Sequence, residues 1–145
     1  MSQWKYILDA PVRHLTPLAV PFRFKNDWLE IVAEEGCACL TVAKGYAWDG
    51  ATLVPDAKGT FFATALHDAV YQWSEDIAAE WGWSLRDVIR WADKIFKERM
   101  IQDGASSFVV CLYYRGVRML GYAYHQMAKA ALGLRRERAG RHREQ

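Results

Sequence analysis

The hydrophobic pattern of this 145-residue chain changes near residue 58. Before that point, short segments rich in aromatic and β-branched residues are separated by proline, glycine or polar residues, a pattern typical of strands joined by turns. The expected strands are Lys5–Leu8, Phe22–Lys25, Trp28–Ala33 and Cys37–Ala43. The last two are separated by a short turn that ends in Gly36, which predicts an antiparallel hairpin.

After residue 58 the apolar residues recur with the period of a helix. A first helix is expected from Phe61, and a second begins after the cap residue Ser84 and ends at Asp103-Gly104. A third is predicted from about residue 107 to residue 132. The fold class is therefore α+β, with a small N-terminal antiparallel β-sheet followed by three α-helices.

The composition is that of one soluble globular domain, with 52% hydrophobic residues, 25% charged residues and a net charge of +2. This charge is too small to predict nucleic-acid binding, and no nucleic-acid motif is present. The three cysteines match neither a disulfide framework nor a zinc spacing, which favours a reducing compartment. Residues 1–133 are expected to form a single α+β domain, and the arginine-rich residues 134–145 a basic, mobile tail.

The third predicted helix is apolar on nearly all sides, so a transmembrane span has to be weighed. Arg115 and Arg118 argue against it, because each costs about 2.5–3.5 kcal/mol near the centre of a bilayer. A helix buried at the centre of the domain is the better interpretation, with both arginines reaching carboxylates or solvent. Membrane association is not expected, and the start of the chain lacks a signal-peptide pattern, so we expect a cytoplasmic protein.

Four polar residues have no role in capping the predicted helices: Asp49 in a turn, His67 and Asp68 on the first helix, and Asp93 on the second. The helical residues border the apolar stripes, so packing of the two helices is expected to bring them together. The set could bind a divalent metal that activates water, or it could orient His67 as a general base. The alternative is a buried network in which His67 bridges Asp93 or Asp49 and Arg118 compensates the charge.

Four segments carry a family resemblance. They are Gly45-Tyr46-Ala47-Trp48-Asp49-Gly50-Ala51-Thr52, Ala65-Leu66-His67-Asp68-Ala69-Val70-Tyr71, Trp91-Ala92-Asp93-Lys94-Ile95-Phe96 and Tyr114-Arg115-Gly116-Val117-Arg118-Met119-Leu120-Gly121. Their order and spacing resemble the small phage and prophage proteins grouped as domain of unknown function 1353. The resemblance implies a phage or prophage origin but no reaction. It marks as motif positions Asp49, His67, Asp68, Tyr71, Asp93 and Arg118.

The leading hypothesis is a hydrolytic, metal-assisted site. His67 would be a metal ligand or general base, Asp68, Asp93 and Asp49 would be further ligands or would orient the imidazole, and Tyr71 would donate a hydrogen bond. Arg118 would stabilise anionic charge.

The alternative is a non-enzymatic phage accessory or virion protein that binds a phage or host partner through an aromatic surface around Trp81 and Trp83. Exposure of both tryptophans would favour this surface. Either hypothesis predicts a location in the cytoplasm of the host bacterial cell, or in the virion for a structural component.

Overall fold

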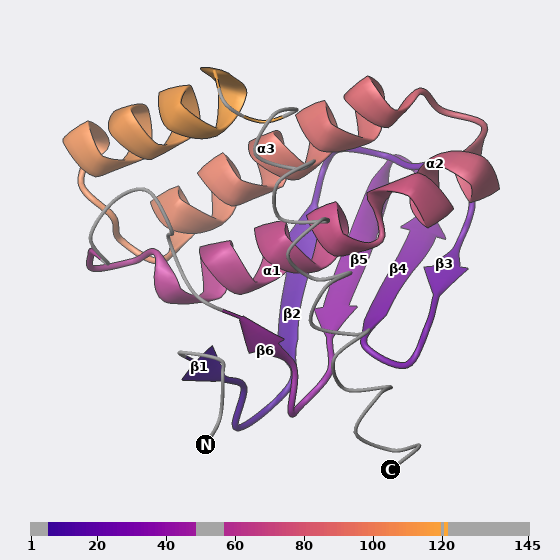
Figure 1. Cartoon of the computed structure of the whole chain (residues 1–145), viewed down its shortest axis with the longest axis horizontal. Coiled ribbons are helices and arrows are strands. Elements are labelled where there is room, and N and C mark those ends of the chain that lie inside the picture. The colour runs from indigo at the N-terminus through magenta and orange to yellow at the C-terminus, as the bar shows by residue number, and fades with distance from the viewer. Residues whose placement is uncertain (1–5, 49–56, 120, 122–145) are drawn as a thin grey trace, which may run out of the picture.

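The computed structural model describes residues 6–48, 57–119 and 121, and it contains the predicted hairpin as strands β4 (Leu29–Glu34) and β5 (Cys37–Val42) (Figure 1). Glu34 pairs with Cys37 across the turn. Gly36 adopts a φ of 73° in this turn, a conformation that glycine reaches without the steric penalty of a side chain. The hairpin follows from the local sequence.

Two more strands complete the larger sheet. β2 (Val12–Thr16) pairs with β5, and β3 (Phe24–Lys25) pairs with β4, so the antiparallel order is β2-β5-β4-β3. A separate two-stranded sheet joins β1 (Tyr6–Ile7) to β6 (Ala47–Trp48). The sequence predicted neither β2 nor β6. β2 is a short strand whose alternate residues point towards the helices.

The helical half contains α1 (Phe61–Gln72), α2 (Ser74–Trp81), α3 (Leu85–Gln102) and a fourth helix, described over residues 107–119 and 121. The α+β class and the order of strands before helices are confirmed. Helix α2 is an addition to the three predicted helices. Its bounds have a local cause, since acidic residues occupy its first turn and Gly82 ends it in the left-handed conformation.

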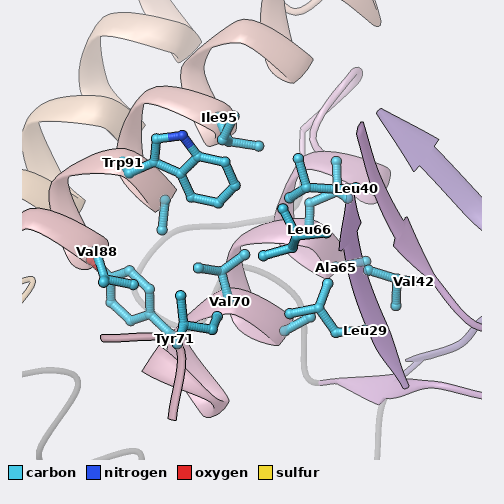
Figure 2. Packing of buried hydrophobic residues seen from close by; sticks show 14 of the residues in the cluster. Leu29, Leu40, Val42, Ala65, Leu66, Val70, Tyr71, Val88, Trp91 and Ile95 are labelled. Atoms are coloured by element: carbon cyan, nitrogen blue, oxygen red, sulfur yellow. The ribbon is translucent and has the colours of Figure 1, made fainter. Parts of the chain in front are cut away.

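Helices α1 and α3 cover one face of the four-stranded sheet and form the main core with it (Figure 2). The sheet contributes side chains from alternate positions of β4 and β5, and each helix contributes its apolar stripe. The labelled residues are Leu29, Leu40 and Val42 from the sheet, Ala65, Leu66, Val70 and Tyr71 from α1, and Val88, Trp91 and Ile95 from α3. This packing determines which polar side chains of α1 and α3 can meet.

The fourth helix lies on the far side of α3 from the sheet (Figure 1, orange). Val110 and Tyr113 pack against Phe96 and Met100 of α3, while Phe108 on the opposite side is exposed. The prediction of a helix buried at the centre of the domain was therefore wrong for the described residues, because α1 and α3 already fill the space against the sheet. None of the helices in the described part of the chain is long and apolar enough to span a membrane.

Candidate functional site

Three helices bring polar side chains together around Asp93, in the middle of α3. His67 and Tyr71 lie one turn apart on α1 and reach the same oxygen: His67 Nε2 is 2.8 Å from Asp93 Oδ1, and the Tyr71 hydroxyl donates to that atom at 2.6 Å. From the fourth helix, Arg118 donates to Asp93 Oδ2 at 2.9 Å. We refer to His67, Tyr71, Asp93 and Arg118 as the Asp93 cluster.

The Asp93 side chain is completely buried, and that of His67 is 5% exposed. Transfer of a carboxylate into the protein interior costs several kcal/mol unless hydrogen bonds and opposite charge compensate it. Here one oxygen accepts two hydrogen bonds and the other accepts a charge-assisted bond from a guanidinium. Both oxygens of Asp93 are therefore occupied by groups of the chain itself.

The second nitrogen of His67 also faces a carboxylate. His67 Nδ1 lies 3.8 Å from Asp68 Oδ1, and the Asp68 side chain is 27% exposed. Burial by itself lowers the pKa of His67, but interactions with Asp68 and Asp93 outweigh it and raise that pKa to about 9. The imidazole is therefore protonated at neutral pH and directs both of its N–H groups towards acidic side chains.

Tyr71 is held in its donor form. Burial, followed by the negative charge of Asp93, raises the pKa of the Tyr71 phenol. The rings of Tyr71 and Phe96 lie 4.0 Å and 4.9 Å from the imidazole of His67, measured between ring centroids. The histidine is thus fixed by ring packing as well as by its charged partners.

Gly121 allows the fourth helix to approach this cluster. A Cβ atom at this position would lie 3.1 Å from the Tyr71 hydroxyl and 3.8 Å from Asp93 Oδ2. Gly121 and Arg118 are three residues apart, so both lie on the helix face that meets α1 and α3. The spacing of these two residues therefore serves helix packing. Arg118 supplies the cation that pairs with Asp93, and Gly121 lets the helix backbone approach Tyr71.

Five of the six predicted site residues lie close together: His67, Asp68, Tyr71, Asp93 and Arg118. Asp49 lies outside the described residues. The arrangement matches the alternative in which His67 bridges to Asp93 and Arg118 compensates the charge. The sequence could place these residues on facing helix borders, but it could not show that they would bind one another.

The described donor set does not fit a metal ion. Within the described residues, no group of three or more His, Cys, Asp or Glu side chains has an arrangement that could hold a cation. The reason lies in the contacts of the cluster. Both nitrogens of His67 face carboxylates of the chain, and the Arg118 guanidinium occupies the side of Asp93 that His67 leaves open.

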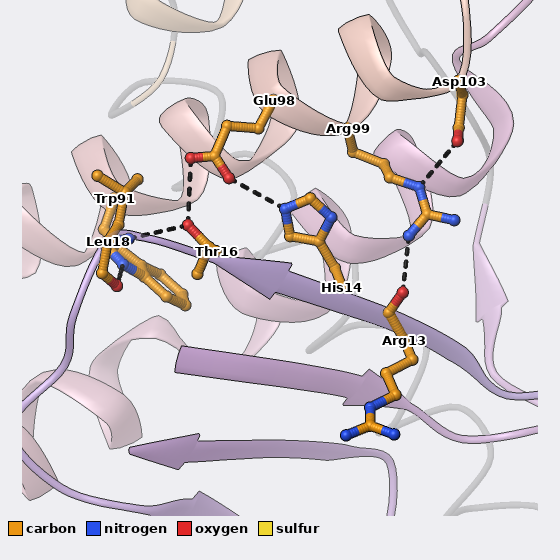
Figure 3. A network of polar contacts seen from close by, with 8 residues as sticks. All are labelled: Arg13, His14, Thr16, Leu18, Trp91, Glu98, Arg99 and Asp103. Atoms are coloured by element: carbon orange, nitrogen blue, oxygen red, sulfur yellow. Dashed lines mark hydrogen bonds and ion pairs between the residues drawn. The ribbon is translucent and has the colours of Figure 1, made fainter. Parts of the chain in front are cut away.

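A second polar cluster, which the sequence did not predict, connects β2 to α3 (Figure 3). His14 Nε2 and Thr16 Oγ1 each lie 3.1 Å from an oxygen of Glu98. We refer to His14, Thr16 and Glu98 as the Glu98 cluster. Residue Arg99 ties the same two elements by donating to the carbonyl oxygen of Arg13 at 2.8 Å. In β2 the buried residues Val12, His14 and Thr16 alternate with exposed residues. This alternation is the sequence pattern that could have predicted the strand.

The predicted aromatic surface is reduced by the packing of α2. Trp81 is 3% exposed and contacts Trp83 and Trp91 edge to face, with ring centroids 5.0 Å and 5.3 Å apart. Trp83 is half-buried. The condition that would favour the aromatic surface, exposure of both tryptophans, is therefore not met, because Trp81 belongs to the core.

Comparison of the chain with known protein families, with curated proteins and with solved structures finds no match.

Proposed function

We propose that this chain is a non-enzymatic accessory protein of phage type that acts by binding a protein partner. In this proposal the Asp93 cluster stabilises the domain and carries out no reaction. One observation carries the proposal: the Asp93 side chain is fully buried, and both of its oxygens accept hydrogen bonds from other side chains of the described residues.

The protonation of His67 supports the same conclusion. A general base needs an unprotonated nitrogen that faces the substrate. The raised pKa of His67, about 9, keeps the imidazole protonated near neutral pH, and its two nitrogens face Asp93 and Asp68. Water activation by this histidine would require the loss of a proton that two carboxylates hold in place.

The phage origin is supported by the sequence resemblance together with the positions of three of its four motifs. His67 and Tyr71, then Asp93, then Arg118 and Gly121 come from three separate segments and meet at one place. The motif residues would then be retained because they hold α1, α3 and the fourth helix together. The fourth motif, which contains Asp49, lies outside the described residues.

A second candidate function, the hydrolytic site, is favoured by one observation. Asp68 is partly exposed and lies beside His67 Nδ1, so it marks the side from which solvent or a substrate would approach the imidazole. In this alternative His67 would donate a proton, and Asp49 would complete a set of ligands for a divalent metal with Asp68.

Metal binding separates the two functions. The purified full-length protein should contain no stoichiometric divalent metal and should take up none when titrated with Zn²⁺ or Mn²⁺. His67→Ala should lose stability, because it leaves Asp93 with fewer compensating partners. The matched control is His14→Ala, which removes the other buried histidine of the described residues. A stoichiometric metal that is lost in Asp68→Asn and retained in His14→Ala would overturn the proposal in favour of the hydrolytic alternative.

A further inference from the structure

The fourth helix has two apolar faces, and α3 and α1 cover only one of them. Its inner face contributes Val110 and Tyr113 to a small core with Ala63, Phe96 and Met100. On the outer face Phe108 is 75% exposed, Leu112 is 46% exposed and Met119 is 84% exposed. The exposure of Phe108 is not that of a frayed helix end, because Ser106 caps the first turn by accepting a hydrogen bond from the Val109 amide at 3.2 Å.

The exposed residues follow a regular spacing. Phe108, Leu112 and Met119, together with the exposed Arg115, occupy positions separated by four, three and four residues. This is the heptad spacing of a seam that packs against another helix. It gives a narrow stripe, whereas a helix that lies in a membrane surface presents a broad apolar face. The spacing therefore favours a helical partner over a lipid surface.

The charge of this region indicates what kind of helix would fit. From Gly104 to Arg136 the sequence contains no aspartate or glutamate, and Arg115 interrupts the exposed stripe. Residues 122–145 of the same chain carry six basic residues against two acidic ones, so their charge does not complement the stripe. A second copy of this face would also bring arginine towards arginine. Charge complementarity instead requires an acidic partner.

We propose that the outer face of the fourth helix binds an acidic amphipathic helix of another protein. The apolar positions of that helix would pack between Phe108, Leu112 and Met119, and one of its carboxylates would pair with Arg115. This inference names the class of partner, and it rests on the proposed function as a binding protein.

Two synthetic helical peptides test the proposal against the full-length protein. Both carry the same leucine seam; one has glutamate at the flanking positions, and the other has lysine there. The glutamate peptide should bind at least about tenfold more tightly than the lysine peptide, and Arg115→Glu should reverse that preference. Phe108→Ser should weaken binding about tenfold. The control is Leu15→Ser, because Leu15 is 65% exposed on β2 and should not affect binding.

Three outcomes would overturn the proposal. Equal binding of both peptides, or binding of neither, would remove the acidic helix as partner. Flotation with anionic phosphatidylglycerol vesicles that Phe108→Ser abolishes, without peptide binding, would identify a membrane surface instead. A dimer in gel filtration that Phe108→Ser dissociates would identify a second copy of the chain. These outcomes are independent of the metal titration, so failure here is distinguishable from failure of the proposed function.

Discussion

Two carboxylates of α3, Asp93 and Glu98, each hold a histidine from another element, but the two arrangements differ in completeness. Asp93 is fully buried and accepts from three groups, and its histidine faces a carboxylate on both sides. The Glu98 side chain is 30% exposed. Its partner His14 is buried, and within the described residues His14 Nδ1 has no hydrogen-bond partner.

Burial determines how much each of these polar contacts contributes to stability. At the Asp93 cluster the side chains of Asp93 and His67 are buried, so the removal of a charged partner leaves a charge in the core that water compensates poorly. At the Glu98 cluster the carboxylate reaches solvent and can be hydrated when a partner is lost. A histidine paired with a carboxylate is therefore expected to contribute more to stability in the Asp93 cluster than in the Glu98 cluster.

The largest difference is expected from the isosteric amides Asp93→Asn and Glu98→Gln. In Asp93→Asn the amide would direct an N–H group at donors that now point to the carboxylate. The free energy of unfolding of this variant should therefore fall by about 3–5 kcal/mol. Glu98→Gln should lose only about 1 kcal/mol. Urea unfolding of both variants measures this contrast. Equal losses would show that the two clusters do not differ in the way proposed.

The pH dependence of stability should come mainly from His67. Because folding raises the pKa of this histidine from 6.5 to about 9, the folded state holds the proton more tightly than the unfolded state. The resulting stabilisation is complete below pH 6.5, decreases as pH rises through 9, and amounts to about 3 kcal/mol. Urea unfolding across this range should show the decrease in the wild type and a flatter profile in His67→Gln. Parallel profiles would contradict it.

A glycine pair tests whether the fourth helix belongs to the Asp93 cluster. In Gly121→Ala the new methyl group meets a Tyr71 hydroxyl that cannot move without lengthening its bond to Asp93, so a loss of about 1–2 kcal/mol is expected. Gly116→Ala on the same helix meets nothing within 4 Å and should gain up to about 1 kcal/mol. Thermal unfolding compares them. A gain in both variants would show that the helix is less closely packed against α1.

The smallest effect is expected for His14→Leu. This change removes a buried polar atom that lacks a partner together with one hydrogen bond, and the two contributions oppose each other, so the stability should change by about 1 kcal/mol or less. His67→Leu is the matched comparison and should lose several times more. A severe loss in His14→Leu would mean that β2 depends on the Glu98 cluster as strongly as α1 depends on Asp93.

The parts of the fold that could be predicted depend on neighbouring residues. The turn at Gly36, the cap at Ser84 and the end of α3 at Asp103 all follow from contacts within a few positions, including the hydrogen bond from the Asp87 amide to Ser84 Oγ. The strand β2 escaped prediction because its five residues are stabilised by pairing with β5, which lies far away in sequence.

In the candidate site, too, some features depend on the local sequence and others on tertiary packing. Helical periodicity and hydrophobic patterning are local properties, so the sequence was enough to place His67, Asp68 and Asp93 on the borders of apolar helix faces. Arg118 was one candidate to compensate their charge, but the direct bond from Arg118 to Asp93, the close approach at Gly121 and the occupation of both Asp93 oxygens follow from tertiary packing. The pKa of His67 and the burial of Asp93 depend on how closely three helices pack, and that distance is set by side chains throughout the core.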